Sequence, residues 1–143
     1  ELRGKPVPIP GALDFFEFAD KAGVAIYYIS DRFGEPENKA ATIATLKELG
    51  FPQVSDETVL LYGTSKAERR AVVSKDHKIV LLLGDTLHDF DGVFRKAPTD
   101  VKRAEVDKNA AHFGADWIVF PNATYGDWST APLTAWDAEL VVK

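Results

Sequence analysis

Four apolar runs in this chain have the character of buried β-strands, and segments with helical periodicity separate them. The runs are rich in aliphatic, β-branched or aromatic residues and cover residues 24–29, 58–62, 79–83 and 116–120. Helices are predicted over residues 10–23 and 38–50, from about residue 64, over residues 99–112, and over residues 133–142 at the end. Short strands alternating with helices predict an α/β domain whose parallel sheet is covered on both faces.

The predicted helix ends carry residues suited to them. Gly23, Gly50 and Gly114 each follow a helical pattern, where glycine commonly terminates a helix. Thr64 or Ser65 can cap the third helix, which places Lys66 in its first turn. A lysine there opposes the helix dipole unless an anion compensates it, and taken alone Lys66 is better explained as a solvated lysine among other charges.

Composition narrows the functional classes. With 143 residues and 45% hydrophobic content the chain can bury one sizeable core. A net charge of −5 argues against a nucleic-acid polymer as partner, since a phosphate backbone selects a basic face. The chain has no cysteine, and its three histidines fall in no ligand-spaced pattern, so neither a disulfide framework nor a zinc site is expected.

Polar side chains follow three of the four apolar runs. In open α/β sheets, ligands bind beyond the carboxyl ends of the strands, so these side chains are expected to share one rim. Lys66 is expected near the same edge. The candidates after the three runs are Ser30 with Arg32, Asp85 with Asp89, and Asn122 with Tyr125.

This combination suits phosphoryl transfer. A carboxylate pair suits Mg²⁺, which takes one or two protein carboxylates and leaves positions for phosphate oxygens. A lysine and a hydroxyl can neutralise the remaining phosphoryl oxygens. Taken singly, Asp85 is as readily a turn former or a helix cap. The pair with Asp89 could also serve a glycosidase, but nothing in the sequence places a sugar cleft. The G-x-S-x-G and G-x-G-x-x-G motifs of serine hydrolases and dinucleotide sites are absent.

Five segments, taken in order, resemble the class C acid phosphatases of the haloacid dehalogenase (HAD) superfamily, a branch that includes bacterial outer-membrane lipoprotein 5'-nucleotidases. The resemblance covers nearly the whole chain. It implies an α/β, HAD-like (Rossmannoid) three-layer sandwich with a mostly parallel sheet, of which residues 1–143 form the C-terminal part of a single domain. The segments are residues 10–13 (PGAL), 28–32 (YISDR), 65–69 (SKAER), 84–90 (GDTLHDF) and 121–128 (PNATYGDW).

The resemblance assigns catalytic roles to three residues and a metal to a fourth. Ser30 would hydrogen-bond the transferred phosphoryl group, and Lys66 would balance its charge. Asp85 would ligate Mg²⁺, the one cofactor implied. Asp89 would orient its neighbours or the water shell of the metal.

The substrate side of the site is assigned in the same way. Tyr125 would stack on the base or ring of a nucleoside monophosphate, and Asn122 and Arg32 would lie beside the substrate, with Arg32 structural or charge-balancing. The family usually has asparagine where this chain has Asp31. This departure adds a negative charge near the phosphate.

The family's nucleophile is an aspartate in a D-x-D motif on the first and central strand of the sheet, and this chain has no D-x-D motif at or before its first apolar run. Asp14 is followed two residues later by Phe16 and lies in a predicted helix. We therefore expect an upstream segment of the same protein, or a companion chain, to supply the central strand and the nucleophile, and these 143 residues alone to be inactive. An intact mass near 15.7 kDa without a companion fragment would contradict this hypothesis.

The implied function is a Mg²⁺-dependent acid phosphatase that hydrolyses small phosphomonoesters, such as nucleoside monophosphates, through an aspartyl-phosphate. The alternative is a non-catalytic HAD-like module that binds a nucleotide or phosphate without turnover. A purely structural domain is disfavoured because it gives no reason for Ser30, Lys66 and Asp85 to share a rim. By resemblance alone, the location would be periplasmic, secreted or outer-membrane anchored. Assembly into a homo-oligomer is also possible.

Overall fold

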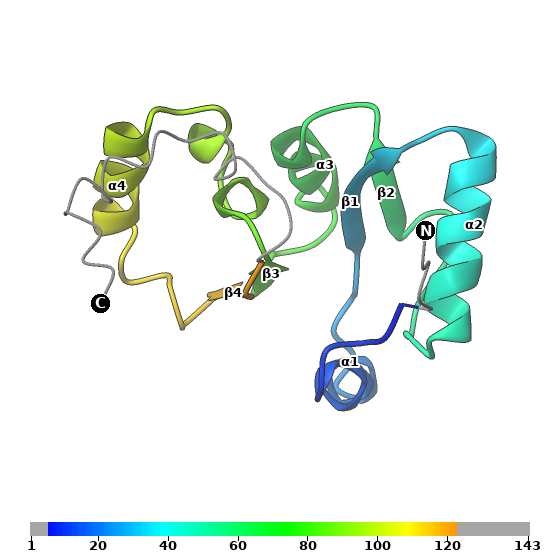
Figure 1. The fold of residues 1–143 in the computed structure, drawn as a ribbon. Helices are drawn as coiled ribbons and strands as arrows, with labels where there is room; N and C mark the ends of the chain where they lie inside the picture. The colour runs from blue at the N-terminus through cyan, green and yellow to red at the C-terminus, as the bar shows by residue number, and fades with distance from the viewer. Residues whose placement is uncertain (1–5, 123–143) are drawn as a thin grey trace, which may run out of the picture. The chain divides into compact units, whose positions relative to one another are not determined.

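The computed structural model of the chain describes residues 6–122, which belong to two compact units divided between Lys78 and Ile79 (Figure 1). Each unit contains one two-stranded parallel sheet. The parallel pairing predicted from the sequence is confirmed. Within residues 6–122 the four strands form two separate pairs rather than one continuous sheet, and no fifth strand is present for the central position that the family resemblance implies.

The first unit pairs β1 with β2, and α2 and α3 lie on either side of this pair (Figure 1). Tyr28 is in register with Val59, and the register shifts between Ile29 and Phe33. Val59, the first residue of β2, is completely buried. The elements in order are α1 (Ala12–Lys21), β1 (Tyr28–Phe33), α2 (Pro36–Glu48), β2 (Val59–Tyr62) and α3 (Lys66–Val73).

The first strand begins later than the sequence predicts. The apolar run starts at Val24, but β1 starts at Tyr28, because the Gln53 side chain occupies the backbone groups before it. Its carboxamide accepts a hydrogen bond from the Ile26 N–H (2.9 Å) and donates one to the Val24 carbonyl (3.0 Å). These groups therefore need no neighbouring strand. β1 also continues three residues beyond Ser30, which was expected to follow its end.

In the first unit, the glycines predicted to follow α1 and α2 do so, and α2 starts earlier than predicted. Gly23 and Gly50 follow α1 and α2 with φ angles of 74° and 87°, the left-handed conformation that suits a residue just after a helix. α2 begins at Pro36 rather than near Asn38, because proline is well accommodated in the first turn.

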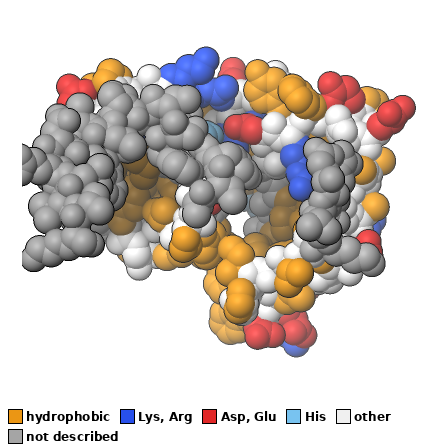
Figure 2. Space-filling model, in the orientation of Figure 1, with side chains coloured by type: hydrophobic (Ala, Val, Ile, Leu, Met, Phe, Trp, Pro, Cys, Tyr) orange, Lys and Arg blue, Asp and Glu red, His pale blue; other side chains and the backbone are white. Residues whose placement is uncertain are grey.

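Around α1, hydrophobic side chains gather on the surface (Figure 2), and Phe18 is 71% exposed.

The second unit pairs β3 with β4 over three residues, with Leu82 opposite Trp117 and Gly84 opposite Val119. The predicted strand from Ile79 is shorter than expected, because only its last residues have a hydrogen-bonding neighbour. The core of the unit consists of Phe90, Phe94 and Trp117. The elements are β3 (Leu82–Gly84), the 3₁₀ turns η1 (Leu87–Asp89) and η2 (Gly92–Phe94), α4 (Thr99–Lys108) and β4 (Trp117–Val119).

Helix α4 of the second unit is shorter than the sequence predicts. α4 ends at Lys108, four residues before the predicted end at His112, and Gly114 follows with a φ of 81°. The helix predicted over residues 133–142 lies outside the described residues. Of the helices within residues 6–122, none has both the length and the apolar character needed to cross a membrane.

Candidate functional site

Ser30 lies half-buried in β1, next to the exposed residues that end the strand. Its hydroxyl oxygen accepts a hydrogen bond from the Arg32 N–H at 3.3 Å. The contact lies where the register of β1 against β2 shifts, between Ile29 and Phe33. The hydroxyl hydrogen remains able to donate to a ligand oxygen, which is the role that the resemblance implies for Ser30. Arg32 itself is exposed.

Lys66 is the first residue of α3, as predicted, and Ser65 is the N-cap. The Ser65 hydroxyl oxygen accepts from the Glu68 N–H (3.2 Å), and Glu68 Oε2 accepts from the Ser65 N–H (2.8 Å). This reciprocal capping box fixes the first turn of the helix and adds a carboxylate where the helix dipole favours one. The half-buried Lys66 is therefore presented from a rigid turn.

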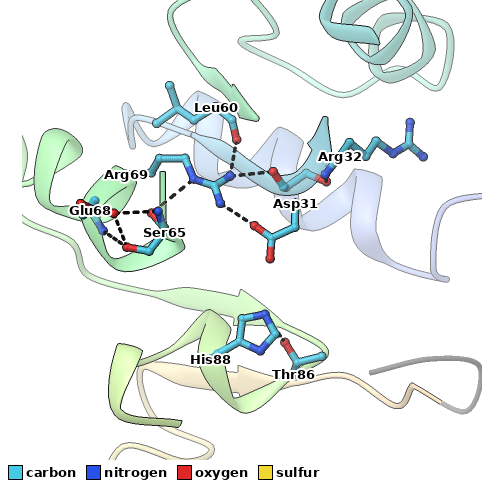
Figure 3. Close-up of polar contacts among 9 residues, drawn as sticks. Asp31, Arg32, Leu60, Ser65, Glu68, Arg69, Thr86 and His88 are labelled. Carbon is cyan, nitrogen blue, oxygen red and sulfur yellow. Dashed lines mark hydrogen bonds and ion pairs between the residues drawn. The ribbon is translucent and has the colours of Figure 1, made fainter. Parts of the chain in front are cut away.

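Arg69 is the buried residue that connects these two segments, and the sequence analysis did not single it out. The residue is 5% exposed. One guanidinium nitrogen, Nη1, donates to the Ser30 carbonyl (2.6 Å) and the Leu60 carbonyl (3.1 Å), while Nε donates to the Ser65 carbonyl (3.4 Å) (Figure 3). The sequence signal for it is the spacing: Arg69 precedes the apolar Val73 by four residues, so the two share one helix face, and both are buried in the structure.

Asp31 is the partner of the remaining guanidinium nitrogen. Arg69 Nη2 lies 2.5 Å from Asp31 Oδ1, an ion pair between a buried cation and a partly exposed carboxylate (Figure 3). The acidic residue at this position, where the resemblance implies asparagine, thus has a cation beside it. Its negative charge, which the sequence analysis expected to act near the phosphate, is balanced within the protein.

In the second unit, the loop after β3 is organised by Asp89. Its Oδ2 accepts hydrogen bonds from the backbone N–H groups of Asp85 and Thr86, both at 3.0 Å. The approach is close enough that a Cβ on Gly84 would lie 2.4 Å from the Asp89 Cβ. Asp89 thereby orients its neighbours, one of the two roles the resemblance suggests. In the same loop Thr86 Oγ1 lies 3.5 Å from His88 Nε2 (Figure 3).

Asp85 and Asn122, predicted as a metal ligand and a substrate-side residue, are in direct contact. The Asn122 side-chain amide donates to Asp85 Oδ2 at 2.9 Å. Both residues are half-buried. The structure therefore brings Asp85, Asp89 and Asn122 together in the second unit, while Ser30, Arg32 and Lys66 belong to the first. The prediction that both groups share one rim stays a prediction, and Tyr125 lies outside the described residues.

The donor set fits a hard cation held largely by water and substrate oxygens. Within residues 6–122, no cluster of three or more acidic or histidine side chains could hold a metal by itself. Mg²⁺ often takes only one or two protein carboxylates, and Asp85 can offer Oδ1 while Asn122 holds Oδ2. A hollow of about 520 Å³ along α2, by contrast, contains none of the predicted site residues.

Comparison with known proteins decides the family. The family profile described as HAD superfamily, subfamily IIIB (acid phosphatase) matches residues 2–128. The chain belongs to this family. It is similar to the structure of the class C acid phosphatase from Bacillus anthracis, with 42% sequence identity and a TM-score of 0.78. A crystal structure of that Bacillus anthracis enzyme with tungstate bound matches at the same identity with a TM-score of 0.77.

The match covers most of this chain but only about half of the Bacillus anthracis chain. Each comparison covers 86% of this chain and 52% of the Bacillus anthracis chain, so the chain spans about half the length of the acid phosphatases it matches. This coverage is consistent with the expectation that the chain corresponds to the C-terminal part of such an enzyme. The HAD-like α/β fold predicted from the sequence is confirmed by the same comparisons.

Proposed function

We propose that the full-length protein is a Mg²⁺-dependent acid phosphatase that hydrolyses phosphomonoesters, with nucleoside monophosphates as its substrate class. Membership of the acid phosphatase family supports phosphomonoester hydrolysis in general. The observation that carries the proposal is the Asp85 carboxylate just beyond β3, with one oxygen held by Asn122 and its loop fixed by Asp89. A carboxylate held in this way suits a divalent cation.

The roles of the described residues follow from their chemistry. The Ser30 hydroxyl donates to a phosphoryl oxygen, and the Lys66 ammonium neutralises the charge that spreads over the equatorial oxygens during transfer. Asp85 holds Mg²⁺, which when bound withdraws charge from the phosphoryl group. An aspartate upstream of this chain is the proposed nucleophile, with the leaving alcohol taking a proton from a second acid.

The proposal is tested with the full-length protein and p-nitrophenyl phosphate at mildly acidic pH, with and without added Mg²⁺. Asp85→Asn is expected to abolish Mg²⁺-dependent hydrolysis, whereas Asp100→Asn on the exposed first turn of α4 is expected to leave it unchanged. Lys66→Ala is expected to lower kcat about 10²-fold to 10³-fold, as for loss of one preorganised charge-stabilising group. The matched control is Lys75→Ala, an exposed lysine after the same helix.

Two outcomes would contradict the assignment in different ways. Full activity of the Asp85→Asn variant would remove Asp85 from the metal site. Binding of a nucleoside monophosphate by the wild-type protein, without turnover at any Mg²⁺ concentration, would favour the non-catalytic binding module. Comparing nucleoside monophosphates with sugar and amino-acid phosphates as substrates then tests the substrate class.

A further inference from the structure

Arg69 makes an unusual set of contacts for a residue with no place in the predicted chemistry. Burying a guanidinium is costly unless its N–H groups are paired, and this one is paired on three of its nitrogens. Its acceptors are the carbonyl oxygens of Ser30, Leu60 and Ser65 and the carboxylate of Asp31. They come from β1, β2 and the N-cap of α3 (Figure 3).

Two of these acceptors belong to, or directly precede, the residues proposed to contact phosphate. Nη1 holds the carbonyl of Ser30 itself at 2.6 Å. Nε holds the carbonyl of Ser65, whose peptide bond leads into Lys66, at 3.4 Å. The guanidinium is planar and its N–H directions are fixed, so bonds from Nε and Nη1 constrain both segments at once. A lysine ammonium in its place would be a point charge without that fork.

We propose that Arg69 is a positioning residue that sets the placement of the Ser30 hydroxyl relative to the Lys66 ammonium, with Asp31 as the counter-ion that holds its guanidinium in orientation. The inference rests on the proposed function, in which Ser30 and Lys66 contact the same phosphoryl group. Misplacement of a substrate-contacting group by about 1 Å can cost on the order of 10²-fold in rate. Arg69 therefore acts on catalysis through these two residues and not through contact with substrate.

Asp31 supplies the negative charge that pairs with the Arg69 guanidinium. A carboxylate bonded to a guanidinium forms a charge-assisted hydrogen bond, which is shorter and stronger than one to a neutral amide oxygen. Asp31→Asn keeps an acceptor oxygen for Nη2 and removes the charge. The variant is thus expected to fold and to loosen the guanidinium only partly.

The test is a double-mutant cycle in the full-length protein, measuring kcat/KM for p-nitrophenyl phosphate and the affinity for inorganic phosphate by calorimetry. Arg69→Lys in the wild-type background is expected to lower kcat/KM about 10-fold to 100-fold. In a background that carries both Ser30→Ala and Lys66→Ala, the same substitution is expected to cost no more than about 3-fold, because both groups that it positions are gone. Arg70→Lys, the same substitution one position along α3, is the control and is expected to change neither quantity.

Melting temperature separates positioning from structure. The decrease caused by Arg69→Lys is expected to be the same in both backgrounds, since the buried contacts are lost in each. Equal fold-losses of kcat/KM in the two backgrounds would overturn the inference and assign Arg69 to stability alone. If Arg69→Lys does not fold, Asp31→Asn takes its place in the same cycle, with smaller expected losses of kcat/KM. Equal fold-losses of kcat/KM for Asp31→Asn in the two backgrounds would likewise overturn the inference. An unchanged kcat/KM in Lys66→Ala itself would instead refute the proposed function.

Discussion

The side-chain amide of Asn122 donates a hydrogen bond to Asp85 Oδ2 at 2.9 Å, joining the segments that follow two neighbouring parallel strands. Asp85 comes directly after β3, and Asn122 comes three residues after β4. The bond leaves Asp85 Oδ1 for another ligand and limits rotation of the carboxylate. Asn122 is thus placed to orient the proposed metal ligand, a role distinct from the substrate contact predicted from the sequence.

Asn122→Ala is expected to raise the Mg²⁺ concentration needed for half-maximal phosphatase activity. Loss of a hydrogen-bonding partner of a metal ligand typically costs about 10-fold to 100-fold in metal affinity or activity. The measurement is a Mg²⁺ titration of p-nitrophenyl phosphate hydrolysis by the full-length protein. Asn38→Ala, which removes an exposed amide contact with Glu35, is the control. A raised KM with an unchanged Mg²⁺ requirement would instead return Asn122 to the substrate side.

Gly84→Ala is expected to disrupt the loop that carries Asp85. The new Cβ would lie 2.4 Å from the Asp89 Cβ and 2.6 Å from Asp89 Oδ2, too close for either atom to stay in place. Asp89 would then release the N–H groups of Asp85 and Thr86, and overpacking of this kind costs about 1–3 kcal/mol. Thermal unfolding measures the loss. Gly63→Ala is the matched control, because nothing lies within 4 Å of its Cβ position, and equal melting temperatures for the two variants would refute the steric argument.

Ser65→Ala removes the side chain of the capping box at the start of α3. The Glu68 N–H loses its acceptor and the Glu68 carboxylate loses the hydroxyl donor, which is 2.7 Å away. The expected decrease in the free energy of unfolding is about 0.5–2 kcal/mol, the usual range for loss of an N-cap. Urea unfolding of this variant is compared with Ser74→Ala at the C-cap, where the side chain has no capping role. Equal stabilities of the two variants would contradict the prediction.

Local patterns in the sequence were sufficient for much of the fold. The capping box at Ser65 and the glycine after α2 are read from residues close in sequence, so the start of α3 and the end of α2 could be predicted. The starts of β1 and β3 could not be predicted in this way, because a strand begins only where a neighbouring strand is available for hydrogen bonding. Val24 and Ile26 are bonded by Gln53, and β3 lacks a partner before Leu82.

The candidate site, too, has parts that local patterns predict and parts that depend on the tertiary fold. Lys66 and Asp85 lie beside a helix start and a strand end that local patterns locate, and Ser30 follows an apolar run although β1 continues to Phe33, so all three could be proposed from the sequence. The contacts of Arg69 with Ser30 and of Asn122 with Asp85 span 39 and 37 residues. Such contacts depend on the tertiary fold, and no local pattern specifies them. They are the contacts that turn a set of suitable residues into oriented groups.

Tyr28 links the stability of the first unit to alkaline pH. Its hydroxyl donates to the Pro52 carbonyl at 2.6 Å, and its ring packs near Phe16 and Phe51. Burial, and secondarily the negative charge of Asp20, raises the pKa of Tyr28 to about 12. The folded protein therefore holds this proton more tightly than the unfolded chain, whose tyrosine pKa is about 10. The resulting stability is fully present below about pH 10 and is lost as the pH rises toward about 12.

Tyr28→Phe is accordingly expected to be less stable than wild type at neutral pH, by about 0.5–1.5 kcal/mol for the lost hydrogen bond. This deficit is expected to shrink above about pH 10. There Tyr28 of the unfolded wild-type chain loses its proton while folded Tyr28 keeps it, which lowers the stability of the wild type but not that of Tyr28→Phe. Free energies of unfolding in urea at about pH 8 and about pH 11 test the prediction. Val73→Ala removes buried packing in the same unit without a titratable group, so its deficit relative to wild type serves as the control. A Tyr28→Phe deficit that stays constant over this pH range, or that grows, would show that ionisation of Tyr28 does not limit stability at alkaline pH.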